Sequence, residues 1–328
     1  MLRFDDIFID CTKLGRKIPK EKYLQKGKHI IIDQGQNDIA GYSNEEDGIF
    51  SDVPVIIFGD HTRIFKLIKS PFFLGADGTK ILKAKISNMS YDYLYYYLKY
   101  KKIPNTGYNR HFKWLKELTF EIKDFNEQEK ISTVLNKVSK ILKMKKQQLS
   151  ELDRLIKFQF LKMFGDPILN EKNWKNAVWK NILIIKNGKN QKQVENIQGI
   201  YPIYGSGGII GYADEYLCEK NTVIIGRKGN INKPILVKTK FWNVDTAFGL
   251  EPIKKVLNSY FLYYFCIFYN FEKHNKAVTI PSLTKNDLLE IKMPLPPIEL
   301  QNKFANFVKQ VDKSKVTFSN SLILEEVA

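Results

Sequence analysis

The segment RKGNINK, residues 227–233, contains the residue types that read DNA by direct contact. Arginine and asparagine side chains can each make two hydrogen bonds to one base, and lysine can neutralise a phosphate. Gly226 and Gly229 would let the backbone come close to a ligand. An exposed basic turn with no ligand has the same composition, so both interpretations stay open. The candidate DNA contacts in this segment are Arg227, Lys228, Asn230, Asn232 and Lys233.

Three further segments carry weaker candidates. Residues 59–63 correspond to the basic segment but have fewer positive charges, and residues 108–111 mix aromatic and polar side chains, with residues 279–282 as their counterpart. The glycine-rich residues 204–208 match neither GxxxxGK[ST] nor GxGxxG, which favours a tight turn without a nucleotide. Its backbone amides could still face a DNA phosphate. The candidates from these segments are His61, Arg63, Asn109, Arg110, His111, Ser206 and Ser282.

No catalytic constellation is found in the sequence. The four histidines lack the spacing of metal ligands, and the three cysteines form neither a CxxC pair nor a disulfide framework. No PD…ExK nuclease pattern can be placed, and no NPPY or DPPY methyltransferase motif is present. We therefore predict a non-catalytic chain with no metal and no cofactor of its own.

Composition sets the class of protein and of partner. The 328 residues can form two core-sized domains, with 44% hydrophobic residues to fill them. The formal net charge of +17 favours a polyanionic partner, most simply double-stranded DNA, although part of the lysine excess can be background composition. The acidic N-terminus is unlike a signal peptide, and the most apolar run, residues 256–271, is too short and polar to span a bilayer. We expect a cytoplasmic protein with no membrane partner.

A long helix over residues 126–164 is predicted to position the candidate residues. This stretch has no proline or glycine, and its apolar residues follow the seven-residue spacing of a coiled coil. At ~1.5 Å per residue the helix is about 55–60 Å long. A shorter heptad helix follows Glu299, and Lys145, Gln159 and Lys315 interrupt the two seams. The seam residues are Ile131, Leu135, Val138, Leu142, Leu149, Leu152, Ile156 and Met163 in the first helix, and Phe304, Val308, Val311, Phe318 and Leu322 in the second. A long amphipathic helix inside one ordinary domain is the alternative.

Two halves of the chain resemble each other. Residues 55–57 match residues 223–225 and residues 94–96 match residues 262–264, both at a separation of 168 residues. A run of such matches in one order indicates a duplicated unit, a strand-rich domain followed by a heptad helix. The predicted fold class is α+β, with two similar domains joined by an antiparallel pair of long helices in a pseudo-two-fold dumb-bell. Each domain is expected to hold a twisted, mostly antiparallel sheet or partly open barrel, with aromatic helices at residues 91–100 and 259–269 packed as core. The predicted ranges are 1–124 and 165–297 for the domains and 125–164 and 298–328 for the helices.

Two similar basic domains held apart by a stiff spacer can each read a short stretch of duplex. The spacer then sets the distance between the two half-sites, as protein geometry does for dimeric repressors. Because the two domains differ in sequence, the half-sites should differ as well. This organisation predicts an asymmetric bipartite DNA site with an unread gap.

The sequence resembles the specificity subunits of type I restriction–modification systems. The resemblance extends over nearly the whole chain and is carried most closely by the second half, in residues 160–174, 201–212, 221–234, 241–250 and 279–301. It implies two target-recognition domains separated by helical spacers that act as a ruler. It also implies that these helices dock two modification subunits, which carry S-adenosylmethionine and methylate adenine. Restriction subunits, which translocate and cleave DNA with ATP and Mg, join that core, and the specificity subunit has no catalytic residues.

Other interpretations stay open beside the resemblance. A stand-alone, repressor-like or orphan DNA-binding protein is supported by the second heptad helix, which is about 15 Å shorter than the first. An enzyme complete in one chain would need a cofactor loop or a metal cluster. An RNA-binding role would need a module that reads single strands.

Overall fold

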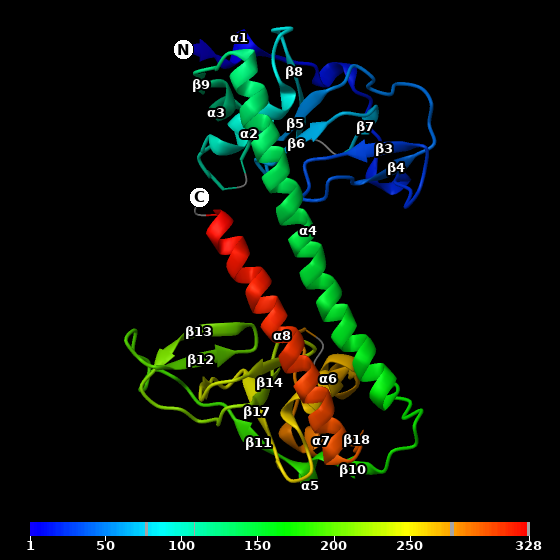
Figure 1. Cartoon of the computed structure of the whole chain (residues 1–328), viewed down its shortest axis with the longest axis vertical. Coiled ribbons are helices and arrows are strands. Elements are labelled where there is room, and N and C mark those ends of the chain that lie inside the picture. Colours follow the sequence, from blue (N-terminus) through cyan, green and yellow to red (C-terminus); the bar gives the residue numbers. More distant parts are fainter. Residues whose placement is uncertain (76–77, 108, 276–278, 327–328) are drawn as a thin grey trace. The chain divides into compact units, whose positions relative to one another are not determined.

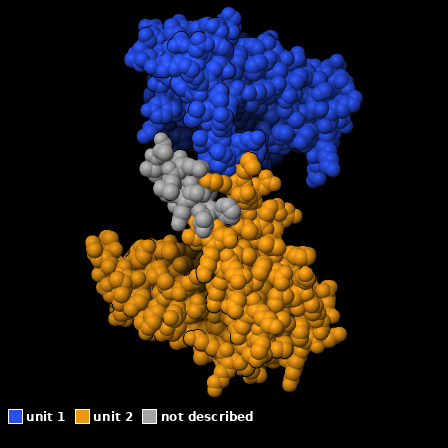
Figure 2. Space-filling view, in the orientation of Figure 1, with its two compact units in different colours: residues 1–143 blue, residues 144–328 orange. Residues whose placement is uncertain are grey.

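The computed structural model describes residues 1–75, 78–107, 109–275 and 279–326, with side chains up to residue 316. The chain divides into two compact units, Met1–Lys143 and Met144–Ala328 (Figure 2). The boundary between the units falls inside the longest helix, α4, Phe125–Phe164.

Unit 1 contains three small sheets. Their strand orders are β1-β9, β2-β8-β5-β6 and β4-β3-β7 (Figure 1). Two helices, α2 and α3, follow the last strand of the four-stranded sheet. The elements are β1 Leu2–Arg3, α1 Phe4–Ile7, β2 Phe8–Asp10, β3 His29–Ile32, β4 Gly41–Ser43, β5 Val55–Gly59, β6 Phe65–Ile68, β7 Phe72–Leu74, β8 Thr79–Ala84, α2 Tyr91–Tyr100, α3 Phe112–Lys116 and β9 Thr119–Phe120.

Unit 2 repeats this arrangement element by element. Its sheets are β10-β18, β11-β17-β14-β15 and β13-β12-β16, and each strand has the same neighbours as its counterpart in unit 1. The elements are β10 Asn176–Val178, α5 Trp179–Ile182, β11 Leu183–Asn187, β12 Tyr201–Gly205, β13 Gly208–Ala213, β14 Thr222–Gly226, β15 Ile235–Val237, β16 Trp242–Asn243, β17 Ala247–Pro252, α6 Ser259–Phe268, α7 Lys285–Leu289 and β18 Lys292–Pro294. The last helix, α8 Ile298–Glu326, corresponds to α4. The duplication inferred from the sequence is therefore a duplication of the fold.

The sheets are mostly antiparallel, as expected, but each unit also contains one parallel pair. β3 pairs with β7 in unit 1, and β12 pairs with β16 in unit 2. At the centre of each four-stranded sheet lies a strand buried along its whole length, β5 or β14. The continuous apolar run in each of these strands fits this position, because a strand covered on both faces needs no polar alternation.

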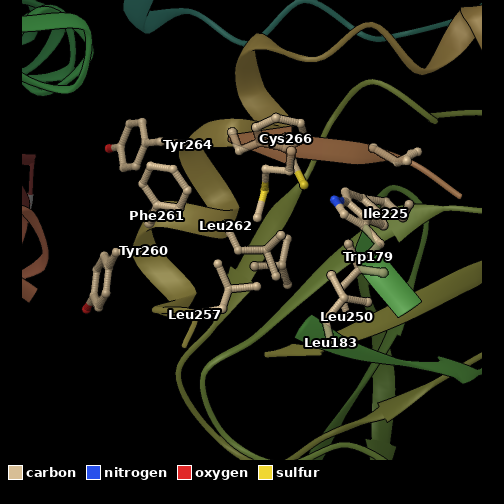
Figure 3. Close-up of a cluster of buried hydrophobic side chains, with 14 of the residues drawn as sticks. Trp179, Leu183, Ile225, Leu250, Leu257, Tyr260, Phe261, Leu262, Tyr264 and Cys266 are labelled. Atoms are coloured by element: carbon tan, nitrogen blue, oxygen red, sulfur yellow. The ribbon is translucent and has the colours of Figure 1, made fainter. Parts of the chain in front are cut away.

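The aromatic helices pack as core, and α6 does so on two faces. Leu262 and Cys266 lie on the side of α6 that faces Trp179 and the sheet (Figure 3). Phe261 and Tyr264 lie on the opposite side of the helix. In unit 1, α2 buries Tyr93, Leu94 and Leu98. Both helices begin at a residue whose side chain accepts a backbone hydrogen bond from the first turn, Ser90 for α2 and Asn258 for α6.

Within unit 2 the end of α4 and the start of α8 run antiparallel. The Phe304 ring lies 5.4 Å from that of Phe160 and 5.5 Å from that of Phe164, between ring centroids. Farther along, Lys315 pairs with Asp153, so the lysine that interrupts the second seam is bound by an ion pair to the first helix. The α+β fold class, with its duplicated units and paired long helices, is confirmed.

The heptad register needs one correction at the end of α4. The fully buried side chains there are Ile156, Phe160 and Phe164, in steps of four, whereas Met163 is only half-buried. A step of four turns the buried face toward α6 as well as α8, since the Phe160 ring also stacks on Phe261 at 5.4 Å. The sequence predicted a stripe of apolar residues that faces one partner helix, but at this end of α4 the buried face contacts two helices, α6 and α8. In the second helix, Phe304, Val308 and Val311 are buried, and Phe318 and Leu322 lie outside the residues whose side chains are described. In the first helix the predicted seam residue Leu135 is exposed.

Candidate nucleic-acid interface

The basic segment of unit 2 joins β14 to β15 and lies beside two other candidate segments. A Cβ atom built on Gly229 would be 3.8 Å from Ser206 Oγ, and one built on Gly207 would be 3.4 Å from Asn230 Nδ2. The glycine-rich turn between β12 and β13 is thus next to the tip of the basic segment. On its other side, Lys228 forms a β-bridge with Ser282. The structure therefore brings Ser206, Arg227, Lys228, Asn230 and Ser282 into one surface region.

Backbone bonds hold this region in shape while its charged side chains stay exposed. The Arg227 N–H donates to the Thr246 carbonyl at 2.8 Å, and the Leu283 N–H donates to the Arg227 carbonyl at 2.9 Å. The Ile231 side chain is buried and anchors the far end of the segment. Gly229 has a φ of +79°, which favours glycine at the turn. A hydrogen-bonded backbone with exposed charged side chains is a suitable base for DNA contact, because little loop order has to be gained on binding.

Arg227 keeps most of its hydrogen-bonding capacity. One guanidinium nitrogen donates to the Asp245 carbonyl at 3.3 Å, and the guanidinium carbon lies 5.9 Å from the centroid of the Phe248 ring. An arginine has five N–H donors. This geometry orients the side chain and leaves donors for a guanine or a phosphate.

Asn232 has a different role from its neighbours. Its amide nitrogen donates to Asn270 Oδ1 at 3.1 Å, and its amide oxygen accepts from the Phe271 N–H at 2.7 Å. Both ends of the amide are thus engaged in holding the segment to the chain after α6. These two bonds give Asn232 a positioning role, while the residue itself stays exposed, so that its DNA contact remains a prediction.

In unit 1, the corresponding region is built around a buried histidine. His111 is 0% exposed, and its Nδ1 lies 3.0 Å from the Asp60 carbonyl oxygen. The Asp60 carboxylate accepts from the Phe112 N–H at 2.6 Å, which ties residues 59–63 to the start of α3. His111 cannot reach a base edge from this position, so its proposed role as a reader is corrected to a structural one. Sequence alone could not separate the two roles, because histidine is common both in cores and at surfaces.

The remaining candidates of unit 1 lie around this histidine. Arg63 is half-buried, has a φ of +61°, and donates to the Ile103 carbonyl at 3.3 Å. The His61 N–H donates to Gln34 Oε1 at 3.1 Å. Asn109 and Arg110 are exposed, and Tyr108 lies outside the described residues. Arg110 is therefore the unit 1 candidate whose charge is most accessible among these described residues.

Sequence reasoning missed the residues that support these loops. Gln34 accepts from the His61 N–H through its side chain, and its carbonyl accepts from the Thr62 hydroxyl at 2.7 Å. Lys66 is 6% exposed, and its ammonium donates to the Asn37 carbonyl at 2.6 Å. Burial lowers the pKa of Lys66, and the nearby Asp33 opposes this shift. A lysine on the alternating strand β6 gave no signal, because its partner comes from a loop distant in sequence.

Two absences complete the description. Among the described residues, no group of His, Cys, Asp and Glu is placed so that it could hold a metal ion. Within the same part of the chain, no helix has the length and apolar character needed to cross a membrane.

Comparison with known proteins places these features in a family context. Residues 171–327 match the model of the type I restriction modification DNA specificity domain. A protein of Methanocaldococcus jannaschii, named as the specificity subunit of the type I restriction enzyme MjaX, is 23% identical over 360 aligned positions, which cover 94% of this chain and 78% of that protein. The resemblance to type I specificity subunits is thus confirmed.

Solved structures share the fold. The S subunit of the type I restriction–modification system of M. genitalium superposes with a TM-score of 0.67 at 20% identity, covering 99% of this chain and 92% of that one. A chain from a structural study of assembly and conformational transition of a type I system gives a TM-score of 0.51 at 13% identity, covering 99% and 95%.

Proposed function

We propose that this chain is a DNA-sequence-specificity subunit of a type I restriction–modification complex, because residues 171–327 match the model of the type I restriction modification DNA specificity domain. In this role it binds an asymmetric bipartite duplex site and contributes no catalytic residue. Unit 2 contacts one half-site through the region around Arg227 and Lys228, and unit 1 contacts the other through the region around Arg63 and Arg110.

One observation carries the proposal. Two units share every sheet neighbour yet differ in the residues on equivalent loops. The loop after β14 begins with Arg227-Lys228, whereas the loop after β5 begins with Asp60-His61. The same scaffold with different contact residues is what two unequal half-sites require, because base choice depends on side chains and not on the sheet.

The long helices are proposed to have two roles. They set the gap between the half-sites, and they dock two methyltransferase subunits, which bring S-adenosylmethionine. ATP and Mg belong to the restriction and translocase subunits that join this core. The support is the length of α4, which at 40 residues is about 60 Å for a regular helix.

Footprinting of the assembled complex tests the bipartite site. We expect two short protected blocks with a few unprotected base pairs between them, and one continuous block would contradict the proposal. Sequencing the methylome of cells with and without this chain would give the two half-sites and their gap directly.

A heptad insertion tests the ruler. Adding seven residues in register between Lys140 and Gln148 keeps the helix face and lengthens α4 by about 10 Å, at 1.5 Å per residue. The preferred gap should then increase, and an unchanged gap would refute this role of the helix. Co-purification with a methyltransferase subunit separates this function from that of a stand-alone DNA-binding protein.

A further inference from the structure

The loop that joins β3 to β4 in unit 1, residues 33–40, presents a row of exposed polar side chains. β3 and β4 pair antiparallel, and the loop lies between them (Figure 1). Its sequence is DQGQNDIA, and residues 36–39 are all exposed. Gln36 and Asn37 supply two adjacent side-chain amides. An amide can donate and accept at the same time, which is the pattern that two hydrogen bonds to one adenine require.

The equivalent turn of unit 2 shows which surface this loop belongs to. Unit 2 pairs Ile203 of β12 with Gly211 of β13, and unit 1 pairs Ile31 of β3 with Gly41 of β4. In both units the isoleucine also has a partner on the parallel strand. Between these paired residues the loop of unit 1 is two residues longer than that of unit 2. Because the tip of the unit 2 turn lies next to the basic segment, the longer loop occupies the corresponding place in unit 1.

Gln34 joins the β3–β4 loop to the residues that follow β5. Its Oε1 accepts from the His61 N–H at 3.1 Å, and its carbonyl accepts from the Thr62 hydroxyl at 2.7 Å. The next residue along the chain is Arg63, a candidate DNA contact. The β3–β4 loop and residues 59–63 therefore form one surface region, as the turn and the basic segment do in unit 2.

A buried lysine holds the backbone of the loop. The ammonium of Lys66, on β6, donates to the Asn37 carbonyl at 2.6 Å and lies 3.5 Å from Asp33 Oδ1. The lysine is 6% exposed. A buried charge is unfavourable unless it is paired, and here the Asp33 carboxylate and the Asn37 carbonyl are its partners. The loop is thus fastened to β6 at its start and again at the residue that carries the second amide.

The charge of the loop favours contact with bases rather than with phosphates. Residues 33–40 include two aspartates and neither lysine nor arginine. Asp33 is paired with Lys66, whereas Asp38 is exposed. Phosphates repel a carboxylate, although the amino group of cytosine in the major groove can donate to one. Phosphate contacts in this region are therefore left to the neighbouring arginines of unit 1.

We propose that Gln36 and Asn37 each read an adenine in the half-site bound by unit 1, and that Lys66 positions both by holding the loop. Asparagine and glutamine can bind the N6 and N7 atoms of adenine with two hydrogen bonds, and each such pair discriminates against the other bases. This inference rests on the proposed function, in which unit 1 binds one half-site, and it names residues that select bases there.

Selection from a randomised duplex library tests the two readers. The full chain, assembled with its methyltransferase subunits, binds duplexes in which both half-sites are randomised. Sequencing the bound fraction then gives the base preference at each position. Gln36→Ala and Asn37→Ala should each reduce the preference for adenine about tenfold at one position. Both positions should lie in the same half-site, and the preferences in the other half-site should remain.

Asn88→Ala is the matched control. Asn88 is an exposed asparagine of unit 1, as Asn37 is, but it lies between β8 and α2. Its substitution should leave every preference within twofold of the wild type. Salt dependence gives a second readout, because the loss of a base contact releases no phosphate contact. Asn37→Ala should therefore leave the slope of log K against log salt unchanged.

Lys66→Met tests the positioning role. The variant keeps an unbranched side chain but removes the ammonium, so the preference for adenine should weaken at both positions together while the other half-site is still selected. Lys69→Met removes the same charge at an exposed position directly after β6 and should leave all preferences unchanged. Thermal unfolding of both variants checks that unit 1 remains folded. Should Lys66→Met unfold it, the two alanine variants still decide whether the loop reads bases.

Three results of the selection would overturn the proposal. The first is unchanged preferences in both Gln36→Ala and Asn37→Ala. The second is a loss that is spread equally over the two half-sites. The third is a loss confined to positions at which the wild type does not select adenine. A wild type that selects no two-part sequence would instead refute the proposed function itself, so the two failures are distinguishable.

Discussion

The side chain of Gln301 joins the first turn of α8 to the start of α6. Its Oε1 accepts from the Asn258 N–H at 2.8 Å, and its Nε2 donates to the Pro296 carbonyl at 2.8 Å. Gln301 is 0% exposed, so these bonds are made away from water. In unit 1, Gln128 makes the equivalent bonds to the Ser90 N–H and the Lys123 carbonyl. A buried glutamine thus joins the first turn of each long helix to the start of the aromatic helix in the same unit.

Replacing this glutamine with leucine should destabilise unit 2. Gln301→Leu keeps the approximate volume but leaves the Asn258 N–H without its partner, which costs about 1–3 kcal/mol. Chemical denaturation followed by tryptophan fluorescence measures the loss, since Trp174, Trp179 and Trp242 all lie in unit 2. The control is Gln310→Leu at an exposed position of the same helix, which should change stability by less than about 0.5 kcal/mol.

Phe160 and Phe158 give a matched pair for the packing of α4. Phe160 is 0% exposed and Phe158 is 62% exposed. Phe160→Ala should cost about 3–5 kcal/mol of unfolding free energy, because it leaves a cavity among five aromatic rings. Phe158→Ala should be near neutral in the same denaturation experiment. Similar losses for both variants would contradict the described packing of α4 on α6 and α8.

Lys228 and Lys220 lie at opposite ends of β14. Comparing their substitutions distinguishes the loss of a specific DNA contact from the loss of one positive charge anywhere on the protein. Each lies two residues outside the strand, and both are exposed. Lys228→Ala should weaken binding to the duplex and reduce the salt dependence of log K by about one unit, as for one lost phosphate contact. Lys220→Ala should leave both quantities unchanged. DNA-binding titrations at several salt concentrations measure the affinity and its salt dependence. Equal effects of the two substitutions would contradict a DNA contact in the β14–β15 segment.

Thiol labelling tests the burial of the cysteines. Burial raises the pKa of Cys218 to about 12 from an ordinary 9.0, and burial also raises the pKa of Cys266. Since the thiolate is the reactive form, iodoacetamide at pH 8 should label the half-buried Cys11 first and the other two only after unfolding. Native labelling of Cys218 as fast as Cys11 would be inconsistent with this environment.

The same pKa shift predicts a pH dependence of stability. Below pH 9 the Cys218 thiol is neutral in both folded and unfolded chains, and its contribution to stability is fully present. Between pH 9 and about 12 only the unfolded thiol ionises, so stability falls as pH rises. Cys218→Ser, which does not ionise in this range, should lose less stability than the wild type over the same interval.

Local patterns in the sequence determined the elements and the duplication. The apolar runs of β5 and β14, the heptad spacing of α4 and the aromatic residues of α2 and α6 are visible without coordinates, because they report burial on a periodic backbone. Gly165, with a φ of +75°, directly follows the end of α4, and a glycine at this position commonly ends a helix.

Tertiary structure alone decided which side chains of a given type are buried or engaged. Phe158 and Phe160 are two residues apart, and only the contacts of α6 and α8 select Phe160. His111 and Asn232 have the composition of DNA contacts, yet Asp60 lies against the buried His111, and Asn270 and Phe271 engage the side-chain amide of Asn232. These partners lie 38 to 51 residues away in sequence. Whether a side chain is buried or hydrogen-bonded depends here on residues distant in the sequence. Such contacts produce no periodic pattern along the chain, so the sequence alone could not reveal them.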